Sequence, residues 1–441
     1  MSTTFFIRPI PTRSGLLAAA GLVALIGSSG CMVKETRPLP KVHAIQAQTE
    51  IPDDYLLDVG VRVLDPGIPQ EIAHDAEKMA GKRIFPDVRR AEARFFAEML
   101  RDTLESSGQW GAVRVIPGNA EFVDVIVTGR ILESSGKEMS IEISVRDSTG
   151  RRWVDARTGE PRRYESPADV GSYLTEEALK LRDPFQNVYS VVANDILAAR
   201  NLLQPAELAN IRRVTELRFA NDLAPQVFGG YLAQDDQGIY RIARLPAADD
   251  PLLQRIMRIR ERDGALIDTV SDYYTSFSDQ LSEPYGNWRR YSYEEIVKEE
   301  KLRAQARTRL IMGAVAVAGA VLLPGQCRGG DYNCRRIENA ARTGAVTGGI
   351  AGILSGLKKK GEAQIHTAAI RELANSFQSE VAPQVVEVEG RTLKLAGTAE
   401  DQYREWREML KQMYLEETGG VSTQATGPAA TPEPVPATTT R

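Results

Sequence analysis

Residues 88–116 read VRRAEARFFAEMLRDTLESSGQWGAVRVI, and this stretch decides the fold of the first part of the chain. Its apolar side chains recur at intervals of three and four, the spacing that places them on one face of a helix; they are Ala91, Phe95, Met99, Leu100 and Leu104. Gly108 stands where a glycine commonly ends a helix. The stretch therefore predicts a helix over 88–106, followed by a strand over 112–116.

Strand patterns lie on both sides of this helix. Leu57, Val59, Val61 and Val63 alternate with polar residues and glycine before the turn Asp65-Pro66-Gly67, which is typical of a half-buried strand. After the helix, strands are predicted over 112–116, 122–132, 139–145 and 152–154. The order strand, helix and then further strands predicts a small N-terminal α/β sandwich over 53–165, and an α+β fold class.

A family resemblance rests on these residues. The helix ARFFAEMLRDTLESSGQWGAVRVI, the strand FVDVIVTGRILE and a strand ending at a D-x-x-G turn resemble the periplasmic α/β domain of several envelope lipoproteins. These are the auxiliary lipoproteins of ABC-type lipid-trafficking systems, the penicillin-binding-protein activators and the curli-secretion lipoprotein. The resemblance covers 53–165 alone and implies a domain that binds other proteins and catalyses nothing. It carries no individual functional residue over to this chain.

The N-terminus follows the pattern of a secreted chain. Arg8 and Arg13 precede the short apolar run GLLAAAGLVALI, and small residues lead up to Cys31. The small residues before a cysteine resemble a bacterial lipobox, although Ser28 stands where such boxes carry Leu. The resemblance implies a signal peptide over 1–30, lipidation of Cys31 and a tether over 31–52; the alternative is an ordinary signal peptide cut nearby. In lipoproteins of this kind, an Asp directly after the lipidated cysteine implies retention at the inner membrane. Met32 stands at that position here, which favours the periplasmic face of the outer membrane of a Gram-negative bacterium.

The middle of the chain is predicted to be helical. A mostly helical domain is expected over 166–250, with a strand pair at 227–233 and 239–245. A long helical stalk is expected over 251–309, made of two helices. The first carries a coiled-coil seam, formed by Ile267, Val270, Tyr274, Phe277 and Leu281. The second begins at the capping box Ser292–Glu295, after an aromatic and arginine stretch over 285–291 that is either a packed corner or a partner site.

The composition changes abruptly over 310–357, where LIMGAVAVAGAVLL and AARTGAVTGGIAGILSGL flank a polar loop. In the second arm, glycines recur at every fourth position, on one stripe of a helix; they are Gly344, Gly348, Gly352 and Gly356. Each glycine disfavours the helix by roughly 1 kcal/mol, so close helix packing has to compensate. The first arm offers small residues for that packing, Gly313, Ala316 and Ala320. This pattern resembles the glycine zippers of envelope lipoproteins and predicts an apolar helical hairpin.

Three settings are compatible with the hairpin: insertion into a membrane, packing against other copies of the chain, or packing inside its own core. Cys327 and Cys334, in the polar loop, are expected to form a disulfide at the tip. Free thiols or a zinc site are the alternatives. Beyond the hairpin, 358–417 is predicted to hold a helix, a β-hairpin and a second helix, and the Thr/Pro-rich stretch 418–441 to be a disordered tail.

The sequence holds few candidates for catalytic or metal-binding residues. The chain of 441 residues has a formal charge of -4, so it has no net positive charge that would attract nucleic acid. Its three histidines and three cysteines are not spaced as metal ligands are. No nucleophile motif or phosphate-binding loop is present, so no catalytic residue, cofactor or small-molecule substrate is expected. The expected function is a non-catalytic assembly or adaptor lipoprotein, anchored by its lipid, that forms homo-oligomers or binds an envelope protein. The alternatives are a component of a lipid-trafficking or secretion conduit and, with less support, a cell-envelope hydrolase.

Overall fold

The structure, a computed structural model, describes residues 41–154, 160–166, 179, 182–247, 249–322, 384–388, 391–395 and 398–418. Its strands are β1 (Val59–Arg62), β2 (Val113–Ile116), β3 (Val125–Ser134), β4 (Met139–Asp147), β5 (Arg162–Glu165), β6 (Leu232–Gln234), β7 (Tyr240–Ile242), β8 (Gln384–Val388) and β9 (Arg391–Leu395). Its helices are α2 (Ala76–Gly81), α3 (Pro86–Glu105), α5 (Gln186–Arg200), α6 (Pro205–Leu223), α7 (Pro225–Phe228), α8 (Pro251–Leu322) and α10 (Ala399–Thr418), with short 3-10 turns η1 (Asp53–Tyr55) and η2 (Gln70–Ile72). The mixed helix and strand content confirms the α+β class.

The central sheet has five strands in the order β2-β1-β3-β4-β5. β1 pairs in parallel with both β2 and β3, whereas β3, β4 and β5 pair antiparallel. The helix α3 connects the parallel neighbours β1 and β2, so the order strand, helix, strand, strand, strand is confirmed. Gly108 has a φ of +65° just after α3, the left-handed conformation that glycine adopts readily at a helix end.

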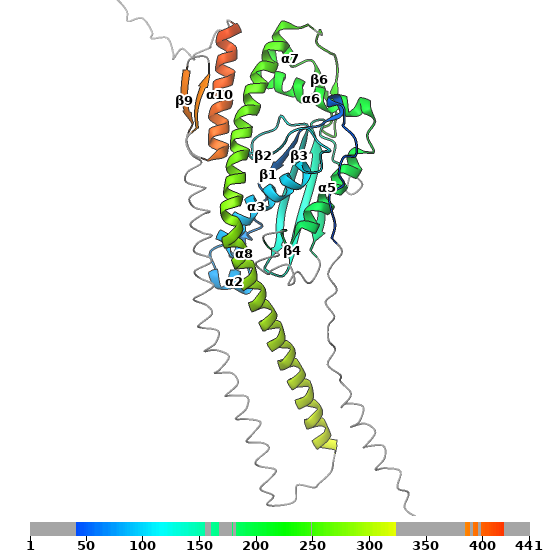
Figure 1. Cartoon of the computed structure of the whole chain (residues 1–441), viewed down its shortest axis with the longest axis vertical. Helices are drawn as coiled ribbons and strands as arrows, with labels where there is room; N and C mark the ends of the chain where they lie inside the picture. Colours follow the sequence, from blue (N-terminus) through cyan, green and yellow to red (C-terminus); the bar gives the residue numbers. More distant parts are fainter. Residues whose placement is uncertain are drawn as a thin grey trace, which may run out of the picture. The chain divides into compact units, whose positions relative to one another are not determined.

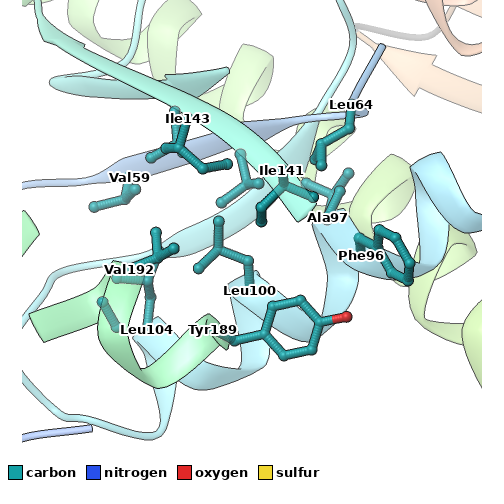
Figure 2. Packing of buried hydrophobic residues seen from close by; sticks show 14 of the residues in the cluster. Val59, Leu64, Phe96, Ala97, Leu100, Leu104, Ile141, Ile143, Tyr189 and Val192 are labelled. Atoms are coloured by element: carbon teal, nitrogen blue, oxygen red, sulfur yellow. The ribbon is translucent and has the colours of Figure 1, made fainter. Parts of the chain in front are cut away.

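One face of this sheet carries the main core. Val59 and Val61 of β1 belong to this core together with α3 and α5, and so do Ile141 and Ile143 of β4. Figure 2 shows Val59, Ile141 and Ile143 on the same side as Leu100 and Leu104 of α3, with Val192 and Tyr189 of α5 closing the layer. Packing of a two-residue repeat against a helical repeat is what the sequence pattern over 57–116 predicts.

The helix α8 is the longest element and spans 72 residues without a break, with Pro284 inside it. At 1.5 Å per residue it is about 108 Å long, and Figure 1 shows it passing the sheet and continuing beyond it. The prediction of two helices with a new start at Ser292 is therefore wrong. The seam from Val270 to Leu281 is buried in the main core, and Ile267 is buried in a second core cluster, so this part of α8 closes the body of the protein instead of forming a free stalk.

The second core cluster is formed mainly by α6, α7, the start of α8 and α10. α10 runs antiparallel to the start of α8, because Tyr403 meets Asp263 and Glu417 meets Arg255. The antiparallel partner of α8 therefore comes from the C-terminus of the chain. The predicted β-hairpin before it is confirmed as β8 and β9, and the predicted helix over 399–417 as α10.

Two strand predictions need correction. Residues 152–154 form no strand: Arg152 makes an isolated bridge to Arg146, and the fifth strand is β5, ten residues later in the sequence. Val227 belongs to α7, so the pair at 227–233 and 239–245 shrinks to β6 and β7. The turn after Asp147 is satisfied by its own side chain, which accepts hydrogen bonds from Thr149 and Trp153. Backbone pairing with β4 is limited to the hydrogen bonds of Trp153 with Val145 and of Asp147 with Arg151, which is too short to make a strand.

Candidate functional site

The candidate site is the place where α8 is held to the sheet body through buried charges. Arg289 is 3% exposed, and its Nη1 lies 2.8 Å from Oδ2 of Asp183. Its guanidinium also lies over the ring of Tyr285, 4.3 Å from the ring centre, and Tyr285 stacks on Trp288. A cation over aromatic rings and paired with a carboxylate is a strong contact away from water. We call Glu92, Asp183, Tyr285 and Arg289 the α8 anchor.

Glu92 connects this anchor to α3. Its Oε1 accepts hydrogen bonds from Tyr285 (2.8 Å) and Ser134 (2.6 Å), while Arg89 lies 3.7 Å from its other oxygen. Burial raises the pKa of the Glu92 carboxyl above its ordinary value, although Arg89 and the two hydroxyl donors oppose the shift. Desolvation of this kind penalises the charged form of a buried carboxyl, and hydrogen bonds and nearby cations counter it.

Two further contacts hold α8 along the body. The backbone N–H of Val115, on the edge strand β2, donates to Oγ of Ser271 at 3.1 Å, so α8 closes that edge of the sheet. Thr275 donates to Oε1 of the buried Glu98 on α3 at 2.7 Å. These contacts fix the position of α8 before it reaches the anchor.

The turn between β3 and β4 touches the backbone of α8 directly. A Cβ atom added to Gly136 would lie 2.0 Å from the carbonyl oxygen of Arg289 and 2.5 Å from the amide nitrogen of Tyr293. The N–H of Gly136 also donates to Oγ of Ser292 at 3.3 Å. Only glycine permits two backbones to approach so closely, and this turn therefore fixes α8 at its exit from the body.

The C-terminal helix is held by a second buried charge. The guanidinium of Arg407 lies over the rings of Phe122 and Phe219, 4.8 and 4.4 Å from their centres. It pairs with Asp222 on α6 and lies 3.6 Å from Asp263 on α8. Burial raises the pKa of Asp263, and the nearby Arg407 opposes that shift. α10 is thus bound to two helices that precede it by well over a hundred residues.

An acidic cluster at the end of α3 gives a pH prediction. Burial raises the pKa of Asp102 to about 6; Arg101 opposes the shift, and repulsion from Glu98, Glu105 and Asp279 adds to it. Because the folded pKa lies above the ordinary value of 3.8, the folded state binds the proton more tightly and loses stability as the pH rises from about 4 to 6. Asp102→Asn should therefore be more stable than the wild type at pH 7, by less than about 1 kcal/mol since the side chain is 49% exposed. Urea unfolding at pH 4 and pH 7 checks this, and a less stable variant at pH 7 would contradict it.

Most residues that the sequence singled out lie outside the described residues. These are Cys31, Cys327, Cys334, Gly344, Gly348, Gly352 and Gly356, together with all of the tail predicted over 418–441 except Thr418, which ends α10. Gly313, Ala316 and Ala320 lie on α8, whose helical backbone includes residues 310–322 of the first apolar arm. The predictions of lipidation, of a disulfide and of a glycine zipper therefore stay predictions.

The aromatic stretch over 285–291 has a different role from the predicted corner. Tyr285 and Trp288 are buried inside a continuous helix and belong to the main core. The anchor itself was not predicted, although one signal for it was present. Glu92 falls on the apolar face of the α3 helix, four residues after Val88 and three before Phe95, and a carboxylate there needs a buried partner.

The described residues contain no group of three or more His, Cys, Asp or Glu side chains placed to hold a metal ion. Among the helices of the same part of the chain, none combines the length and the apolar character needed to cross a bilayer. No protein-family model, no curated protein and no solved structure matches this chain.

Proposed function

We propose that the chain is a non-catalytic lipoprotein of the outer membrane of a Gram-negative bacterium, and that it acts as an assembly or adaptor component on the periplasmic face. Lipid on Cys31 would hold it to the membrane. The body, defined as residues 41–300 and 398–418, would present the protein-binding domain that the sequence resembles. The arm, defined as residues 301–383, would carry the glycine-rich hairpin to a bilayer or to other copies of the chain.

The observation that supports this proposal most is the continuity of α8. The helix belongs to the core up to the anchor, and the same helix includes residues 310–322 of the apolar run. A helix transmits position and rotation along its axis because each turn is hydrogen-bonded to the next. Buried contacts such as Arg289–Asp183 and Thr275–Glu98 fix the helix in the body. The start of the arm thus has a defined direction from the body.

The return of the chain to α10 supports a hairpin in the arm. Glu400 lies near Tyr274 in the body and influences its pKa. From Tyr274 to Leu322, α8 rises about 72 Å, so the end of α8 lies far from the start of α10. A helical hairpin, with two apolar arms and a polar loop, is the prediction that fits these two end points.

The test uses the glycine stripe. Replacing Gly348 and Gly352 with leucine is expected to abolish assembly or membrane retention and to leave the body folded, because leucine at these positions prevents close helix packing. The change is made in the full chain with Cys31→Ser, so that the lipid does not mask the contribution of the arm. Mass in mild detergent measures assembly, membrane fractionation measures retention, and circular dichroism measures folding.

Gly264→Leu is the matched control, because it makes the same change on α8 at a position where an added Cβ would meet no atom within 4 Å. It should leave mass and fractionation unchanged. If the variant with leucine at Gly348 and Gly352 leaves the membrane fraction, the arm contacts the bilayer. If the variant loses a defined oligomer, the arm mediates contact between copies of the chain. Unchanged mass and fractionation in the stripe variant would overturn the role of the arm.

A further inference from the structure

A cavity of about 630 Å³ lies beside the anchor, between α3 and α8. Phe95, Met99 and Leu179 supply its apolar walls, and Asp183 and Arg289 lie at its border with the anchor. Gly286 lines it from α8, and a Cβ added there would lie 3.4 Å from Cδ1 of Leu179, an ordinary contact distance. This volume is within the range of small-molecule sites, which are mainly apolar with a few placed polar groups.

Two buried donors border the cavity without an acceptor among the described residues. Ser278 and Arg289 are each 3% exposed, and both line the cavity. Oγ of Ser278 and Nε of Arg289 have no hydrogen-bond partner in the described part of the chain. Buried donors in folded proteins are almost always paired, so two of them at one cavity indicate a ligand that supplies acceptor oxygens.

The charges near the cavity favour a single negative charge on that ligand. On the buried side, Arg89 lies 3.7 Å from Glu92 and Arg289 lies 2.8 Å from Asp183, so each of these carboxyl groups has a cation beside it. Nε of Arg289 has no such partner, and an anionic oxygen is the acceptor that a guanidinium binds most strongly. The lining carboxylates Asp279 and Glu283 are exposed, so water weakens their repulsion of one anionic group on a ligand. A second negative charge on the ligand would add to this repulsion.

We propose that this cavity binds a monoanionic amphiphile, with a carboxylate or phosphodiester oxygen accepting hydrogen bonds from Arg289 and Ser278 and a hydrocarbon chain against Phe95, Met99 and Leu179. The site is separate from the arm and does not depend on the proposed role of the arm. It adds a small-molecule ligand to a chain whose sequence indicates none.

The test measures binding of single-chain probes to the full chain carrying Cys31→Ser. Dodecanoate supplies a carboxylate, lauroyl lysophosphatidylglycerol a phosphodiester, dodecanol a neutral head and dodecyltrimethylammonium a cation. Titration calorimetry below the micelle concentration should show at least one anionic probe binding about tenfold or more tightly than the neutral and cationic probes. Binding of dodecanoate alone would identify fatty acids as the source, and binding of the lysophospholipid alone would identify phospholipids.

Variants separate this cavity from the apolar arm, which could also take up amphiphiles. Gly286→Leu places a side chain in the cavity while improving helix propensity, and should weaken binding about tenfold or more. Gly264→Leu, on the same helix but away from the cavity, should leave binding unchanged. Ser278→Ala removes one donor and should weaken binding by about two- to tenfold. Equal binding by Gly286→Leu and wild type, equal binding of dodecanol and the anions, or no binding by any probe would each overturn the proposal.

Discussion

Replacing Arg289 with methionine is expected to lower the free energy of unfolding by about 3–5 kcal/mol, because it leaves the carboxylate of Asp183 buried without its cation. Methionine keeps much of the volume against Tyr285 and Phe185, so the loss reports on charge more than on packing. Denaturant unfolding at neutral pH measures the effect. Deuterium exchange should also show earlier opening of α8 beyond the anchor than at its start.

Arg290→Met is the neighbouring control. Arg290 is half-buried and donates to Asn287 one turn earlier on the same helix, so its loss should change stability by less than about 1 kcal/mol. Adding Asp183→Asn to Arg289→Met should restore part of the stability, because asparagine can still accept the N–H of Phe185 without carrying a charge. Equal effects of the Arg289 and Arg290 changes would show that the buried pair does not hold α8.

Gly136→Val is expected to lower the free energy of unfolding by about 3 kcal/mol or to detach α8 where it passes this turn. The added Cβ would overlap two backbone atoms of α8, and no change of rotamer can move a backbone atom out of its way. Thermal unfolding measures the loss. Exchange of the amides over 289–300 distinguishes local detachment from a loss spread over the whole body.

Gly81→Ala is the control for the loss of a glycine. A Cβ at that position would meet no atom within 4 Å, so stability should stay within about 0.5 kcal/mol or rise slightly. If Gly136→Val were equally harmless, the contact between the β3–β4 turn and α8 would not restrain the helix in solution.

The local elements of the body could be predicted because each one carries its own period. α3 shows helical spacing and a terminal glycine, and β1 shows strict alternation before a turn. These signals depend on neighbours within a few residues, so they need no knowledge of the tertiary fold. The pairing of β1 with both β2 and β3 was not predicted, because the period of a strand does not identify its neighbours in the sheet.

The break predicted in α8 shows where local signals fail. Pro284 and the capping pattern at Ser292 both favour a helix end in an isolated chain. In the fold, Tyr285 and Trp288 are buried against α3, and Gly136 holds the next turn. Tertiary packing of this kind outweighs a local preference of about 3 kcal/mol, and no window of sequence around Pro284 contains those partners.

The anchor could not be assigned for a similar reason. Arg289 and Asp183 are more than a hundred residues apart, and Tyr285 and Glu92 nearly two hundred. The sequence shows a carboxylate, Glu92, on the apolar face of a helix, but it does not show which side chains donate hydrogen bonds to it. The cavity beside the anchor is a product of the same long-range arrangement.

The position of α10 makes the body a discontinuous domain, interrupted by the arm. Trp406 and Leu410 complete a core whose other walls are made much earlier in the chain. The body therefore cannot complete its folding during synthesis until the arm and the last helix have followed. A product that stops before Ala399 would leave Phe219 and Phe122 without the arginine that covers them, so an incomplete chain would differ from a complete one in the body itself.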